Sequence, residues 1–399
     1  MSKPDDDSEA LQPATRLVRS GRDRSLTGPF VNPPVVHAST VLFDSVDDML
    51  SGRQRYRYGR RGTPTMEALE QAVTELEGAA GTVICPSGLA AASTALLAAV
   101  KGGDRLLMVD CVYAPVRHFA DTILKRFGVE TVYFDPGIGS GIAGLMDDNT
   151  RAIYLESPGS VTFEMQDVPA IAAVAHARDA VVLQDNTWAT ALNFKPLAFG
   201  ADFSVQSGTK YLGGHSDIML GTVSASVTAW PGLKETHGTL GICAGPDDMY
   251  LALRGLRTLA VRLDRQMASG LTVAGWLEKR PEVATVLHPG LPGAPGHELW
   301  KRDMKGASGL FGIVLDGWSD ERTKAFIDGL RLFGIGASWG GFESLAILAH
   351  SSAHGHVGAS RTATRWPSEG PLIRFNIGLE DPGDLIADLD ASFAATADL

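Results

Sequence analysis

The chain has 399 residues, 44% hydrophobic and 20% charged, which is an ordinary globular composition with room for one large and one smaller domain. Its net charge of −11 excludes a general nucleic-acid-binding surface, which would be basic. The three cysteines are scattered and show no metal-ligand spacing, so we expect a reducing compartment without a disulfide framework.

The N-terminal region has few core positions. Its first ten residues are acidic and lack the apolar region of a signal peptide. The longest nearly apolar stretch of the chain, Leu89 to Val100, is shorter than the ~20 residues that cross a bilayer. We therefore expect a cytoplasmic protein with no membrane contact. Residues 1–30 are expected to be a mobile arm, and the basic, aromatic run Arg53 to Arg61 is expected to lie against something other than its own core.

A regular alternation of helices and strands begins near residue 64. Pro64 to Glu77 has apolar residues at helical spacing, and Leu89 to Val100 and Val168 to Arg178 are also predicted to be helices. Short apolar runs between the helices predict a largely parallel sheet, whose ligands bind at the carboxyl ends of the strands. These predicted strands are Thr82–Cys85, Leu106–Val109, Thr131–Phe134, Ala152–Leu155, Val181–Gln184 and Phe203–Gln206.

The pattern changes near residue 250. A long helical pattern from Asp247 to Leu277 precedes a strand at Leu310–Leu315, a helix at Ser319–Leu330, and strands around Leu345 and Ile373. This predicts an N-terminal arm (1–62), a large α/β domain (63–258) and a small α+β domain (259–399).

Two charged residues stand at the ends of predicted buried strands. Lys210 follows Phe203–Gln206, and Asp185 follows Val181–Gln184. Buried charges are costly unless they are paired or used chemically. A desolvated lysine is an amine nucleophile toward an aldehyde, and an aspartate suits the protonated ring nitrogen of pyridoxal phosphate (PLP). The pair therefore indicates a PLP site with a Schiff-base lysine.

Several weaker motifs have two interpretations each. Ser87-Gly88-Leu89 joins a strand to a helix and either binds a phosphate or is an ordinary turn. Ser207 and Thr209 either hydrogen-bond the phosphate or are turn residues.

Tyr113 and Arg374 also leave alternatives open. Tyr113 either stacks on a flat ring or is packed, and Arg374 binds either a substrate carboxylate or a structural carboxylate. The histidines from His350 to His356 favour a solvated loop over a metal site, so no metal is expected.

Taken together, these segments resemble the Cys/Met-metabolism family of PLP enzymes, of fold type I, from about residue 30 to the C-terminus. SGTKYLGGHSD (207–217) matches the family's lysine segment at Lys210, and DNTWA (185–189) matches the ring-nitrogen partner at Asp185. SGLAA (87–91) matches the phosphate loop. YGRRGTPT (58–65) is similar to a segment that reaches into the neighbouring subunit.

The resemblance implies roles for the residues that match. Lys210, Tyr113 and Tyr58 would be catalytic. Arg60 would bind the phosphate of the partner chain's cofactor, so active sites would be shared within a homotetramer built as a dimer of dimers. Further cofactor contacts would come from Asp185, Ser87, Gly88, Leu89, Tyr113, Ser207, Thr209 and Tyr58, and substrate contacts from Arg374, Ser338, Trp339 and Tyr113.

Within the family, GRRGT (59–63), ESPGS (156–160) and SWGGFES (338–344) are most similar to the bacterial β-lyases that act on cystathionine. The resemblance implies cleavage of L-cystathionine to homocysteine, pyruvate and ammonia, a step toward methionine. Around His237-Gly238, such β-lyases often have a tyrosine near the substrate, and this chain has none there. The alternatives are a γ-lyase or a broad cysteine-S-conjugate β-lyase of the same family, and a non-catalytic α/β scaffold.

Overall fold

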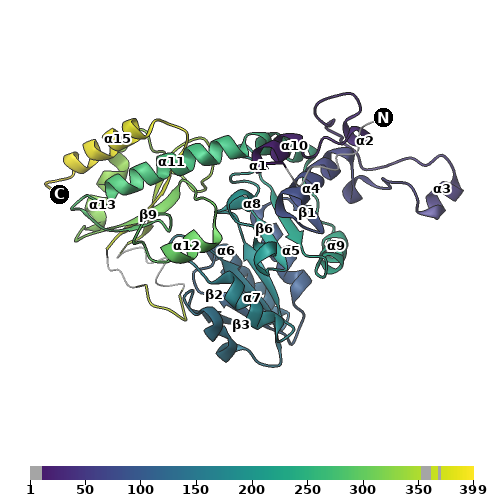
Figure 1. Cartoon of the computed structure of the whole chain (residues 1–399), viewed down its shortest axis with the longest axis horizontal. Helices are drawn as coiled ribbons and strands as arrows, with labels where there is room; N and C mark the ends of the chain where they lie inside the picture. Colours follow the sequence, from purple (N-terminus) through teal and green to yellow (C-terminus); the bar gives the residue numbers. More distant parts are fainter. Residues whose placement is uncertain (1–10, 352–360, 367–369) are drawn as a thin grey trace.

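The computed structural model describes residues 11–351, 361–366 and 370–399 of the chain (Figure 1). A seven-stranded sheet has the strand order β1-β7-β6-β5-β4-β2-β3, and a four-stranded sheet has the order β10-β11-β9-β8. The strands of the large sheet are β1 (Gly81–Cys85), β2 (Arg105–Val109), β3 (Glu130–Phe134), β4 (Thr150–Glu156), β5 (Val181–Asp185), β6 (Phe203–Gln206) and β7 (Gly221–Ala225). Those of the small sheet are β8 (Val283–Leu287), β9 (Leu310–Leu315), β10 (Leu345–His350) and β11 (Leu372–Asn376).

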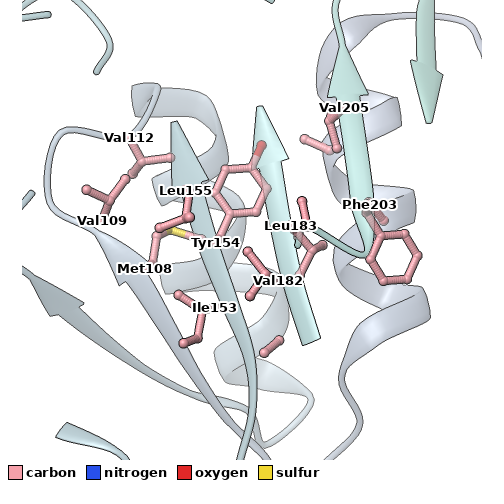
Figure 2. Close-up of a cluster of buried hydrophobic side chains, with 14 of the residues drawn as sticks. Met108, Val109, Val112, Ile153, Tyr154, Leu155, Val182, Leu183, Phe203 and Val205 are labelled. Carbon is pink, nitrogen blue, oxygen red and sulfur yellow. The ribbon is translucent and has the colours of Figure 1, made fainter. Parts of the chain in front are cut away.

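The large sheet is mostly parallel, as predicted. Strands β6, β5, β4, β2 and β3 run parallel to one another, and β7 runs antiparallel to both β6 and β1. Figure 2 shows part of the core on the central strands, where Met108, Ile153, Tyr154 and Leu183 are buried. The carboxyl ends of β4, β5 and β6 therefore lie side by side at one edge of the sheet.

Helices cover the large sheet and extend from it. The helices of this part are α1 (Pro13–Arg19), α2 (Arg24–Thr27), α3 (Val46–Ser51), η2 (Gly59–Arg61), α4 (Pro64–Glu77), α5 (Gly88–Ala99), α6 (Ala114–Phe119), η3 (Ala120–Leu124), η4 (Gly139–Leu145), α7 (Val168–His176), α8 (Thr190–Asn193), η5 (Pro196–Phe199), α9 (Trp230–Thr239) and α10 (Pro246–Arg257). The remaining helices are α11 (Leu259–Leu277), α12 (His297–Asp303), α13 (Asp320–Gly329) and α15 (Pro382–Ala395).

The predicted helix Pro64–Glu77 is confirmed as α4, and its ends have local causes. The Thr63 side chain caps the first turn by accepting from the Met66 N–H at 3.2 Å, and Pro64 fills the first helical position. At the other end Gly78 has a φ of +68°, the left-handed conformation that ends many helices at glycine.

Two expectations for the helical regions were wrong. Residues 13–27 form α1 and α2, and Leu17 and Leu26 are buried in a cluster with residues of α4 and α10, so the described part of the expected mobile arm packs on its own chain. The predicted long helix from Asp247 to Leu277 is two helices, α10 and α11, with Thr258 between them. The apolar periodicity continues across this break, so spacing alone did not reveal it.

The small sheet packs with α11, α13 and α15 around a second core that contains Phe311, Phe326, Phe375 and Phe393. In Figure 1 the long helix α11 extends from the large sheet to this core, and α3 projects at the opposite end of the molecule. The boundary at residues 258 and 259 coincides with the break between α10 and α11, but the division into domains stays a prediction.

Most of the histidine run after His350 lies outside the described residues. Among the residues that the structure describes, no helix is both long and apolar enough to span a bilayer.

A buried carboxyl group lies beneath the strand that leads to Lys210. Glu77, on the last turn of α4, is 2% exposed. Its Oε1 accepts from Ser204 Oγ at 3.0 Å and from Gln206 Nε2, both on β6, while its Oε2 has no hydrogen-bond partner among the described residues. Burial raises the pKa of Glu77 to about 7, so the carboxyl group is neutral in the folded chain at mildly acidic pH.

We expect Glu77 to make the protein less stable as the pH rises. The folded-state pKa of about 7 lies above the ordinary 4.5, so its stabilising contribution is complete below pH 4.5 and lost as the pH rises through 7. Relative to Glu77→Gln, wild type should lose on the order of 1–3 kcal/mol of unfolding free energy between pH 5 and pH 8. Denaturant titrations at both pH values measure this, with Glu278→Gln as the exposed control. Parallel pH profiles for wild type and Glu77→Gln would contradict the assignment.

Candidate functional site

Lys210 follows β6 and contacts Ser338 and Trp339, which precede strand β10 of the small sheet. Its Nζ donates to Ser338 Oγ at 2.6 Å and lies 5.3 Å from the centroid of the Trp339 ring. Burial is the main cause that lowers the pKa of Lys210 to about 8, and the Arg374 charge acts in the same direction, whereas Asp185 opposes it. The amine is therefore uncharged in a substantial fraction of molecules at mildly alkaline pH.

Asp185 ends β5, the strand next to β6. Its Oδ1 accepts from the Thr187 N–H at 3.0 Å and from the Thr187 hydroxyl at 2.6 Å. Burial raises the pKa of the carboxyl group, and the Thr187 contacts, Tyr154 and Lys210 partly offset that rise. Thr187 also accepts from the Ser207 N–H at 2.9 Å, so one side chain connects the Asp185 carboxylate to the segment that carries Lys210.

The first turn of α5 and Ser207 form a possible cradle for an anion. The Ser87 side chain caps α5 by accepting from the Ala90 N–H at 3.1 Å, and the Ser87 carbonyl accepts from the Ala91 N–H. The N–H groups of Gly88 and Leu89 thus remain available, as at every helix start. The Ser207 hydroxyl has no hydrogen bond with any described residue and lies so close to Gly88 that a Cβ there would be 2.5 Å from it.

Thr209 is used differently from Ser207. Its hydroxyl donates to the Leu220 carbonyl at 3.1 Å and accepts from the Leu220 N–H at 3.0 Å. A hydroxyl has one proton to donate, so a phosphate contact from Thr209 would require loss of the bond to Leu220. The turn interpretation therefore describes the observed contacts of Thr209, and its predicted cofactor contact stays a prediction.

Tyr113 begins α6, and its side chain is about half exposed, with 48% of its surface accessible. The Tyr113 N–H donates to Glu156 Oε2 at 2.7 Å, and Glu156 ends β4 in register with Asp185 on β5. Burial, Glu156 and Asp185 raise the pKa of Tyr113, while Arg374 lowers it. The ring is thus outside the core, where a packing role would have placed it, and the charges of Glu156, Arg374 and Asp185 act on its hydroxyl.

Arg374 lies on β11, and its guanidinium donates to the Ser338 carbonyl at 3.0 Å. No carboxylate among the residues described by the structure forms an ion pair with it, so the salt-bridge alternative has no support there. Burial lowers the pKa of Arg374 to about 10, which still leaves it charged at neutral pH. Ser338 has a φ of +87°, an uncommon conformation for a residue other than glycine, and it contacts both Arg374 and Lys210.

Tyr58 and Arg60 are not part of this group within the chain. The described residues show no hydrogen bond or ion pair between either of them and the residues around Lys210. The run from Arg53 to Arg61 was expected to lie against something other than its own core, but the Arg60 guanidinium donates to the Gly238 carbonyl of the same chain at 2.9 Å. The guanidinium of Arg61 fills the space beside Gly238, since a Cβ on Gly238 would lie 2.0 Å from Arg61 Nη1. The Gly238 site would therefore admit a tyrosine only if Arg61 moved.

Sequence reasoning did not assign roles to Thr187 and Glu156. Thr187 stands two residues after Asp185, a spacing at which an aspartate side chain often accepts from the backbone, so this contact had a local signal. Glu156 stands in the quoted segment ESPGS, but its contact with Tyr113 joins positions that are distant in the sequence and had no such signal.

The chemistry of these groups fits PLP. The Lys210 amine suits the aldehyde, the Asp185 carboxylate suits the ring nitrogen, and the available N–H groups and the Ser207 hydroxyl suit the phosphate. All of these groups lie at or shortly after the carboxyl ends of β1, β5 and β6, which lie at one edge of the large sheet.

Comparisons with known proteins agree with this geometry. A family model described as Cys/Met metabolism PLP-dependent enzyme matches residues 14–394. The cystathionine beta-lyase MetC of Escherichia coli is 46% identical over 95% of this chain and 98% of its own length. An L-alanine/L-glutamate racemase of Wolbachia pipientis is 40% identical over 95% of this chain and 96% of its own.

The fold comparison points to the same group of proteins. The crystal structure of cystathionine gamma synthase from Xanthomonas oryzae, in complex with aminoacrylate and cysteine, has a TM-score of 0.89 and 33% identity. The match covers 97% of this chain and 99% of that one. The predicted α/β fold of type I is thereby confirmed.

Gly88 offers a test of the cradle that does not depend on turnover. In Gly88→Ala, the new methyl group would collide with Ser207 and widen the gap between Ser207 and α5. Loss of one hydrogen bond to a charged phosphate should weaken PLP binding about tenfold or more. Titration of the cofactor-free protein with PLP, followed by visible absorbance, measures the dissociation constant. Gly275→Ala is the control because nothing lies within 4 Å of its Cβ; equal affinities for both variants would argue against the cradle.

Proposed function

Because the chain belongs to the family of Cys/Met metabolism PLP-dependent enzymes, we propose that it is a carbon–sulfur β-lyase that cleaves L-cystathionine. The products would be homocysteine, pyruvate and ammonia, which places the reaction in methionine biosynthesis. The observation that carries the proposal is the partly buried Lys210 amine, which donates to Ser338 and has a pKa of about 8 under the influence of burial, Arg374 and Asp185. The 46% identity to the E. coli cystathionine beta-lyase supports β- over γ-cleavage.

The chain's own residues account for the proton transfers. When bound, PLP supplies an electron-withdrawing ring that stabilises negative charge at the substrate Cα. Lys210, with its low pKa, removes the Cα proton and can return a proton to the departing thiolate at Cβ. The unsaturated three-carbon product then hydrolyses to pyruvate and ammonia. Asp185 keeps the ring nitrogen protonated, and Thr187 holds the Asp185 carboxylate by two hydrogen bonds.

Other residues orient the substrate. Arg374 is charged, partly buried and without a carboxylate partner among the described residues, so it can bind the substrate α-carboxylate through paired hydrogen bonds. Ser338 and Trp339 form the adjoining wall next to Lys210. Tyr113, held at its N–H by Glu156, can stack on the cofactor ring, and Ser87, Gly88, Leu89, Ser207 and Thr209 would surround the phosphate.

We also propose that the active sites are shared between subunits of a homotetramer. Among the described residues, Tyr58 and Arg60 form no hydrogen bond or ion pair with the residues around Lys210 in their own chain, and they would serve the site of the partner subunit. The segment that carries them is unusually apolar on its surface, with Phe30 73%, Leu42 85% and Leu50 73% exposed. Exposed apolar residues in this number suggest a surface covered by another copy of the chain. The three unpaired cysteines support a cytoplasmic location.

Product analysis tests the proposed reaction. Purified holoenzyme supplied with L-cystathionine should release pyruvate and homocysteine in equal amounts, and Lys210→Ala should release neither. Release of 2-oxobutyrate would indicate γ-cleavage instead. Pyruvate from cystine but not from cystathionine would indicate a broad cysteine-S-conjugate lyase, and the absence of a visible PLP band would indicate a scaffold. Racemisation of L-alanine without C–S cleavage would point to the activity named for the Wolbachia relative.

Subunit complementation tests the shared site. Arg60→Ala and Lys210→Ala should each be nearly inactive alone. After subunit exchange, a mixed dimer would contain one site with both lesions and one with neither, so about half of the sites in mixed dimers should recover activity. If Arg60 served its own chain, every site in the mixed dimer would carry one lesion and activity would stay low. Exchange is followed independently with differently tagged subunits.

A further inference from the structure

Tyr154 presents a buried hydroxyl group that the proposed reaction does not use. The side chain lies on β4 and is 0% exposed, and its hydroxyl has no hydrogen-bond partner of ordinary geometry among the described residues. A buried polar group without a partner costs about 1–3 kcal/mol, so most such groups in proteins have one. The hydroxyl is therefore expected to have an acceptor in the functional state.

The position of Tyr154 indicates which acceptor that is. Residues two apart on a strand share a face of the sheet, so Tyr154 and Glu156 point to one side. Glu156 is the register partner of Asp185 on the parallel strand β5, and Asp185 therefore lies on that same face. Figure 2 shows the Tyr154 hydroxyl directed toward the carboxyl end of β5, where Asp185 lies.

Asp185 has room for another donor. Its Oδ1 takes both contacts with Thr187, and among the described residues its Oδ2 has no partner that meets ordinary hydrogen-bond geometry. The approach of the Tyr154 hydroxyl nevertheless lowers the pKa of Asp185. The other titratable groups that face Asp185 are Glu156, Tyr113 and Lys210. Glu156 already accepts from the Tyr113 N–H, and its pKa is raised well above the ordinary value by burial and by Asp185, which favours its neutral form.

We propose that Tyr154 is a positioning residue that donates a hydrogen bond to the Asp185 carboxylate in the PLP-loaded enzyme. The bond would favour the ionised carboxylate and so leave the shared proton on the cofactor's ring nitrogen. Without the tyrosine proton donor, Asp185 would become a stronger base and draw that proton toward itself. This proposal rests on the proposed role of Asp185 at the ring nitrogen.

The test is Tyr154→Phe, which removes the hydroxyl and keeps the ring that fills the core. The variant should bind PLP fully, but its turnover should fall by about tenfold or more, as for loss of one hydrogen bond to a charged group. The pH midpoint of the visible PLP band should also move upward, because a less positive ring lets the Lys210 nitrogen keep its proton to higher pH. A role in packing alone would not move that midpoint.

The matched control is Tyr211→Phe. The Tyr211 hydroxyl is likewise buried and without a partner of ordinary geometry in the described chain, but the groups that influence it are Ser308, Gly309 and Arg262 rather than Asp185. Thermal unfolding of the cofactor-free variants reports on folding, and neither should be markedly less stable than wild type. If Tyr154→Phe changed turnover and the spectral midpoint no more than Tyr211→Phe, the proposal would be overturned.

Double variants identify the acceptor. Tyr154→Phe should add little in an Asp185→Asn background and should keep its full effect in a Glu156→Gln background. The reverse pattern would assign the hydroxyl to Glu156 and reject the proposal. Asp185→Asn alone should lose most turnover; if it does not, the proposed role of Asp185 fails. A strong Asp185→Asn effect with a silent Tyr154→Phe would reject the Tyr154 proposal alone.

Discussion

The cost of holding an amine and a carboxylate away from water is the constraint on which this structure depends. An unpaired charge in a protein interior is strongly destabilising, and proteins respond by shifting pKa values or by supplying hydrogen bonds. Lys210 shows the first response, with its pKa lowered to about 8, and Asp185 shows the second, with two hydrogen bonds from Thr187. Burial in this case prepares the two groups for proton transfer.

The same constraint explains why the site needs both sheets. Asp185 and Lys210 follow neighbouring strands of the large sheet, whereas Arg374 comes from the small sheet. Ser338 links them, because its hydroxyl accepts from Lys210 and its carbonyl accepts from Arg374. If the small sheet shifted against the large one, two things would change at once: the contact that holds the Lys210 amine and the position of the Arg374 guanidinium. The unusual backbone conformation of Ser338 is consistent with this double contact.

Local signals predicted a large part of the fold. The range of α4 was predicted correctly from the helical spacing of its apolar residues and from the proline at its start, and the structure adds a cap and a glycine that fix its ends. The strands β2, β4, β5 and β6 were found because strands buried on both faces contain short apolar runs. The edge strand β3 is only partly buried and was found from its β-branched and aromatic residues. The strand β7 (Gly221–Ala225) was not predicted, since its residues are small and polar. The packing of α1 on α4 and α10 was also missed, because two buried leucines in a polar segment are a weak signal.

The sequence by itself determined the chemistry of the site, since a lysine and an aspartate at the ends of two buried strands limit what those groups can do. It also determined their proximity, because parallel strands place their carboxyl ends at one edge of a sheet. Only the tertiary structure decided how each group is tuned. The contacts of Lys210 with Ser338, of Tyr113 with Glu156, and the approach of Tyr154 to Asp185 join residues that are far apart along the chain or on different strands. Such contacts arise from packing, and a one-dimensional pattern carries no record of them.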